Sequence, residues 1–181
     1  MSAPFDFLRE FRARLRAAGI RAILTSGMAC VHYGLQLTTK DSHWIVSGTE
    51  LEPLRDLLTQ LEGGLPPWRV SYRAICGAPL DVEYLGGGWS SHLATWDSAA
   101  SLAQHVDLFC RPPRVRHPEA DADGWATREV LAMMKRTQRE RDWPLLDALG
   151  WQMLLHDPAR ALVHLQDPAK LVQAWKAADT A

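Results

Sequence analysis

Two short segments of the chain carry acidic side chains at a spacing suited to divalent-metal chemistry. Asp41 and His43 are two residues apart, and so are Asp81 and Glu83 in the alternating segment Leu80–Tyr84. Side chains alternate across a strand, so residues two apart lie on the same face. Carboxylates are the ligands that magnesium prefers, whereas a neutral imidazole suits manganese or zinc better. Asp41 and His43 are therefore a pair of potential metal ligands on one face, and Asp81 and Glu83 share a face in the same way.

The alternation around Asp81 and Glu83 has a second interpretation. Both carboxylates can simply form the solvated face of a half-exposed strand, with no ligand. His43 likewise attracts attention only because it follows Asp41 by two residues.

A Ser-Gly turn precedes the first acidic segment. An apolar run from Ile20 to Leu24 leads to Ser26-Gly27, and a helix-like segment follows up to Gly34. A glycine lets the backbone approach a phosphate closely, and the start of a helix presents free amides and a positive dipole end. Ser26 and Gly27 are therefore candidate phosphate-binding residues, although a tight strand-to-helix turn without a ligand has the same pattern.

Hydrophobic spacing predicts the elements that position these residues. Phe5, Leu8, Phe11 and Leu15 recur at helical spacing, which predicts a helix over residues 5–18. Further helices are predicted over 27–33, 50–61 and 98–105, and strands over 20–24, 40–46, 68–75, 80–85 and 106–110. We therefore expect a mixed α/β core over residues 1–110, a Pro- and charge-rich loop over 111–125, and a helical C-terminal subdomain over 126–181. In the last part, Asp157 and Asp167 each precede Pro-Ala and resemble helix N-caps.

The order of strand, Ser-Gly turn, helix and acidic strand resembles the core of the nucleotidyltransferase superfamily, in particular its minimal and abortive-infection-type members. In that family the acidic strand bears two aspartates one residue apart. Asp41 matches the first of them, and His43 stands where the second is expected. In the family, a single aspartate on a later strand supplies the third carboxylate of the site, and Asp81 is the match in this sequence. Glu83 is then a candidate for the carboxylate that His43 does not supply.

A second part of the resemblance lies in the C-terminal region. The family carries a leucine-rich helix with a lysine, followed by an Arg-x-x-Asp-like step into another helix. Lys135 matches the lysine and Asp142 the aspartate. Arg139 follows Lys135 by four residues, so on one helix both would share a face that can reach a triphosphate. A solvated cationic stripe, or a structural ion pair between two helices, would show the same pattern.

The resemblance implies transfer of a nucleoside monophosphate from a nucleoside triphosphate to an acceptor hydroxyl. Asp41 and Asp81 would hold Mg²⁺ or Mn²⁺, with His43 or Glu83 assisting. The acceptor would be an RNA, a protein or a small molecule. A second hypothesis is a catalytically degenerate member that binds nucleotide or a partner, as in toxin–antitoxin pairs. A plain α/β domain without a nucleotide site is the third.

Bulk composition limits these hypotheses. The 181 residues include 47% hydrophobic residues, and the formal net charge is −1, so no global charge attracts nucleic acid or a membrane. Three widely spaced cysteines favour reduced thiols, and the N-terminal segment has no long apolar run, so we expect a cytoplasmic protein without a membrane span.

Overall fold

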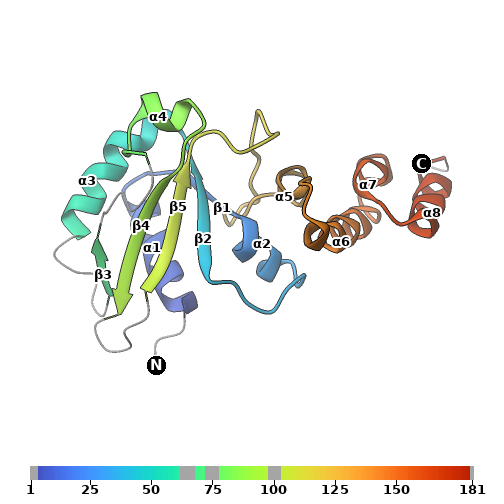
Figure 1. Ribbon diagram of the computed structural model, residues 1–181, viewed down its shortest axis with the longest axis horizontal. Coiled ribbons are helices and arrows are strands. Elements are labelled where there is room, and N and C mark those ends of the chain that lie inside the picture. Colours follow the sequence, from blue (N-terminus) through green and yellow to red (C-terminus); the bar gives the residue numbers. More distant parts are fainter. Residues whose placement is uncertain (1–3, 62–67, 72–77, 98–102, 180–181) are drawn as a thin grey trace.

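The computed structural model describes residues 4–61, 68–71, 78–97 and 103–179. The fold is mixed α/β: a five-stranded sheet lies between helices, and a series of C-terminal helices extends away from it (Figure 1). This architecture confirms the fold class that the sequence predicts.

The sheet contains one parallel pair among otherwise antiparallel neighbours. The strands are β1 (Ala22–Thr25), β2 (Asp41–Val46), β3 (Trp68–Ser71), β4 (Ser91–Asp97) and β5 (Ala103–Phe109). Their order across the sheet is β1-β2-β5-β4-β3. Among these strands only β2 and β5 run parallel, and His43 is the register partner of Asp107.

One face of the sheet packs on two amphipathic helices, α1 (Pro4–Ala17) and α3 (Leu51–Leu61). Trp44 of β2 is 1% exposed and meets Phe11 of α1 edge to face, with ring centroids 5.4 Å apart. Leu54 of α3 joins the same cluster, and a short 3-10 helix (Gly48–Glu50) leads into α3. Burial of this continuous apolar layer is the main force that holds the sheet to its helices.

The opposite face is covered over only part of its length. Ile45 and Phe109 pack against Ala126 and Val130, which precede and begin the helical region. Toward the start of β2, the same face carries Asp41 and His43, which are only partly buried. The sheet therefore presents a polar patch next to an apolar one on a single face.

The C-terminal region is a succession of helices, each packed on the next. It contains α5 (Arg128–Lys135), a 3-10 helix (Glu140–Asp142), α6 (Trp143–Met153), α7 (Pro158–His164) and α8 (Pro168–Ala178). Asp157 and Asp167 cap α7 and α8 as expected, because each carboxylate accepts a backbone N–H of the first turn. Figure 1 shows these helices leading away from the sheet.

Two local predictions around residues 80–105 are wrong. Residues 82–86 form the short helix α4 (Val82–Gly86) rather than a strand, because the Asp81 carboxylate accepts the Glu83 N–H at 2.8 Å and starts a helix. Residues 103–105 belong to β5 rather than to a helix, and β4 was not predicted at all. The part of the predicted 68–75 strand after Ser71, and residues 98–102, lie outside the described residues.

Candidate metal centre

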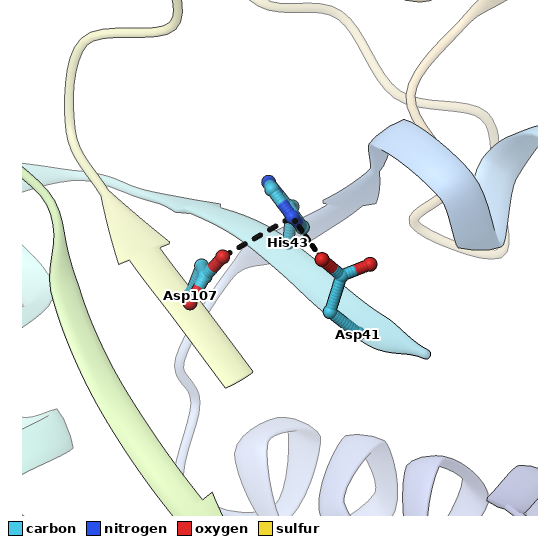
Figure 2. Close-up of side chains that lie close together, drawn as sticks. All are labelled: Asp41, His43 and Asp107. Atoms are coloured by element: carbon cyan, nitrogen blue, oxygen red, sulfur yellow. Dashed lines mark ion pairs between the residues drawn. The ribbon is translucent and has the colours of Figure 1, made fainter. Parts of the chain in front are cut away.

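Three side chains from adjacent strands converge on the open part of the sheet (Figure 2). His43 Nε2 lies 3.2 Å from Asp41 Oδ2 and 3.1 Å from Asp107 Oδ2. Asp41 and His43 share a face of β2 because they are two residues apart, and Asp107 is opposite His43 on β5. The strand register therefore brings the three groups together without any loop.

The neighbouring residues of β2 fix this orientation. Ser42 and Trp44 alternate with Asp41 and His43 and are 2% and 1% exposed. Trp44 Nε1 also donates to Ser42 Oγ at 3.0 Å on the buried side. Because a shift of one residue would move every side chain to the other face, the buried tryptophan keeps the polar pair on the open face.

The surroundings of Asp41 favour its ionised form. Burial alone raises the pKa of Asp41, but the hydrogen bond and charge of His43, together with a hydrogen bond from Thr39, outweigh it and leave the pKa lowered. Thr39 Oγ1 donates to Asp41 Oδ1 at 3.0 Å, which leaves Asp41 Oδ2 toward His43. Asp41 thus stays a ready oxygen ligand near neutral pH.

The geometry fits a divalent cation. Each of Asp41, His43 and Asp107 offers one ligand atom, and these atoms lie within 4.8 Å of one another. Bonds of about 2.1 Å at right angles place neighbouring ligand atoms about 3 Å apart, close to the two distances that His43 Nε2 makes. A single ring N–H cannot point fully at two carboxylates at once, whereas a cation between them would satisfy all three groups. Two carboxylates and one imidazole suit a mixed oxygen and nitrogen coordination.

A second histidine lies behind the cluster. His92 of β4 is the register partner of Asp107, and His92 Nδ1 lies 2.5 Å from Asp107 Oδ1. One oxygen of Asp107 therefore faces His43 while the other faces His92.

The structure does not bring Asp81 and Glu83 to this centre. Both lie at α4, which packs beside the 3-10 helix that follows the far end of β2, where the Val82 side chain approaches Gly48. The six residues of β2 span about 16 Å, so the start and the end of the strand are well separated. The expectation that Asp81 shares a sheet face with Asp41 is wrong, and the carboxylate on the neighbouring strand is Asp107.

The Ser-Gly turn has a packing role of its own. A Cβ built on Gly27 would lie 2.3 Å from Thr39 Oγ1, and Gln36 Nε2 donates to the Gly27 carbonyl at 2.9 Å. The segment before β2 therefore packs directly on Gly27, and Thr39 occupies the space that a side chain at this position would need. Ser26 starts α2 (Ser26–His32) with a left-handed φ of 57° and remains partly exposed.

Lys135 and Arg139 do not share a helix face. Helix α5 ends at Lys135, and Arg139 precedes the next 3-10 helix, so the periodicity on which the prediction depended is interrupted. Lys135 Nζ lies 3.6 Å from the Asp142 carboxylate, which is 5% exposed and also accepts a hydrogen bond from Thr137 Oγ1 at 2.5 Å. Lys135 therefore neutralises a buried acid between α5 and α6, while Arg139 is exposed.

Sequence reasoning missed Asp107 and His92. A signal for Asp107 was present, because an acidic residue between Val106 and Leu108 interrupts an apolar strand. Burial of an unpaired charge is costly, so such a residue marks either an exposed face or a site. For His92 the signal was absent, because the preceding glycine-serine segment obscured the strand to which it belongs.

No protein-family model and no curated protein matches the chain. Among the described residues, no helix combines the length and apolar character needed to cross a membrane.

Proposed function

We propose that the chain is a nucleotidyltransferase-like enzyme that uses a divalent metal held by Asp41, His43 and Asp107. The observation that carries this proposal is the convergence of two carboxylates from adjacent parallel strands on one open sheet face, with His43 between them. Nucleotidyltransferases have a third carboxylate on a strand near the acidic strand. In this proposal Asp107, rather than Asp81, has that role.

In the proposed reaction the acceptor hydroxyl oxygen attacks the α-phosphorus of a nucleoside triphosphate. The new P–O bond forms as the bond from that phosphorus to the α–β bridging oxygen breaks; pyrophosphate leaves and the hydroxyl proton passes to solvent. A divalent metal supplies charge stabilisation for the phosphate oxygens. Asp41, His43 and Asp107 would hold this ion, and Thr39, which donates to Asp41 Oδ1, keeps Asp41 oriented.

Calorimetry with Mn²⁺ and each of the four nucleoside triphosphates tests the proposal. We expect at least one triphosphate to bind only when the metal is present, and pyrophosphate to be released when an RNA or protein acceptor is added. Absence of triphosphate binding with Mg²⁺, Mn²⁺ and Zn²⁺ would exclude a nucleotide site and leave an α/β domain of another kind.

A second candidate is a non-catalytic nucleotide- or partner-binding module. Two observations favour it: His43 stands where the resembling family has a carboxylate, and Thr39 covers Gly27. This candidate predicts metal-dependent triphosphate binding without pyrophosphate release for any acceptor.

The variant His43→Asp probes the metal preference. Wild-type protein should bind Mn²⁺ more tightly than Mg²⁺, because imidazole nitrogen suits the softer ion. We expect His43→Asp, which makes the ligand set all carboxylate, to raise affinity for Mg²⁺ and narrow the difference, as measured by calorimetry with each metal. Unchanged affinities for both metals would show that His43 is not a ligand.

A further inference from the structure

His92 is not one of the three candidate ligands, but it contacts one of them, Asp107. We propose that His92 is a positioning residue, which fixes the Asp107 carboxylate so that Oδ2 faces the metal and thereby sets the metal affinity. This inference rests on the proposed metal site and identifies how that site is held in shape.

The two oxygens of Asp107 have separate partners. Oδ1 lies 2.5 Å from His92 Nδ1, and Oδ2 lies 3.1 Å from His43 Nε2. A carboxylate oxygen without a proton only accepts hydrogen bonds, so this contact requires the form of His92 that has its proton on Nδ1. A hydrogen bond to one oxygen restrains rotation of the carboxylate about its Cβ–Cγ bond, which favours the orientation in which the other oxygen is directed at His43.

His92 is itself held in place by its strand. Its neighbours Ser91 and Leu93 are 0% and 1% exposed, and β4 pairs with β5 through the whole segment around Asp107. His92 contacts the oxygen of Asp107 that faces away from His43. It is therefore placed to orient a ligand rather than to be one, and partners of this kind commonly contribute 10–100-fold to metal affinity.

The test uses the full chain and Mn²⁺ alone, with affinity measured by calorimetry and by electron paramagnetic resonance of the free ion. We expect His92→Ala to weaken Mn²⁺ binding by about 10–100-fold. His92→Asn should restore most of the affinity, because its amide nitrogen occupies the position of Nδ1. His92→Gln, whose amide group lies one carbon further from the backbone, should not.

His156→Ala is the control. His156 is exposed and lies between α6 and α7, in the C-terminal helical region and not on the sheet. We expect its removal to leave Mn²⁺ affinity within about twofold, well below the outer-shell range. An equal loss in His156→Ala and His92→Ala would overturn the inference, since affinity would then follow the number of imidazoles.

The outcomes separate this inference from the proposed function. If the wild type binds Mn²⁺ and both His92→Ala and His92→Asn bind it equally well, His92 does not position Asp107 and the metal site still stands. If His92→Asn is as weak as His92→Ala, the donor position is not what matters and the inference fails. If the wild type binds no divalent ion, the metal site itself is wrong.

Discussion

Asp107→Asn should reduce Mn²⁺ affinity by more than about 100-fold, beyond the effect of an outer-shell partner. The substitution keeps the size of the side chain but removes the negative charge that Asp107 Oδ2 presents 3.1 Å from His43 Nε2. It also disturbs the contact to His92 Nδ1, so both the charge and the orientation at the centre are lost. Calorimetric titration of Mn²⁺ into the purified variant measures the loss, and triphosphate binding that depends on the metal should disappear with it.

Asp81→Asn is the control for this variant. Asn is as good an N-cap as Asp, so α4 should remain capped and the free energy of unfolding should hardly change. Because Asp81 lies beside the far end of β2, metal affinity should equal that of the wild type. A variant series in which Asp81→Asn loses metal binding and Asp107→Asn retains it would reject the centre described above.

Lys135→Met should lower the free energy of unfolding by about 3 kcal/mol, in the range for breaking a buried ion pair. The variant keeps the aliphatic length of the side chain and removes only the charge that faces Asp142. The Asp142 carboxylate is 5% exposed and accepts a hydrogen bond from Thr137 Oγ1. Among the described residues, Lys135 is the cation that forms an ion pair with it, so the variant would leave a buried charge without an opposing one. Denaturant unfolding followed by circular dichroism measures the change.

Arg139→Met is the matched comparison, because it removes the neighbouring positive charge at an exposed position. Its free energy of unfolding should stay within about 0.5 kcal/mol of the wild type. If instead Lys135→Met unfolds like the wild type but no longer binds triphosphate, Lys135 contacts phosphate and is not a structural residue.

Most of the fold follows from patterns that are local in sequence. The stripe of Phe11 and Leu15 predicts α1, the leucines of residues 51–61 predict α3, and the Asp-Pro-Ala triplets predict the starts of α7 and α8. Each of these signals depends on a helical repeat or a cap within one turn. The error at Asp81 has the same origin, because one capping carboxylate outweighs strand-like alternation in a segment only a few residues long.

The site was predicted in part, for a physical reason. Asp41 and His43 are neighbours on one strand, so their spacing alone places them on one face. Their partner Asp107 comes from a strand that pairs with β2 only in the folded sheet, and nothing local specifies which strand that is. His92 depends on a further pairing, that of β4 with β5. To predict a site whose residues come from separate strands, one must know which strands are neighbours in the sheet. Hydrophobic periodicity does not give that order.

Asp41 and His43 belong to β2 and Asp107 to β5, so a metal ion bound by all three would link these two parallel strands and stabilise their pairing. His43 and Asp107 are register partners whose positions differ by 64 residues, so their pairing is non-local and carries a loop-closure entropy cost. An ion bound by both strands binds only after they have met, so its binding free energy adds to the stability of that pairing. At free metal 100 times the dissociation constant, this linkage amounts to about 2.7 kcal/mol. The melting temperature should then rise with metal concentration. The population of chains in which β2 and β5 are unpaired should fall as the metal concentration increases.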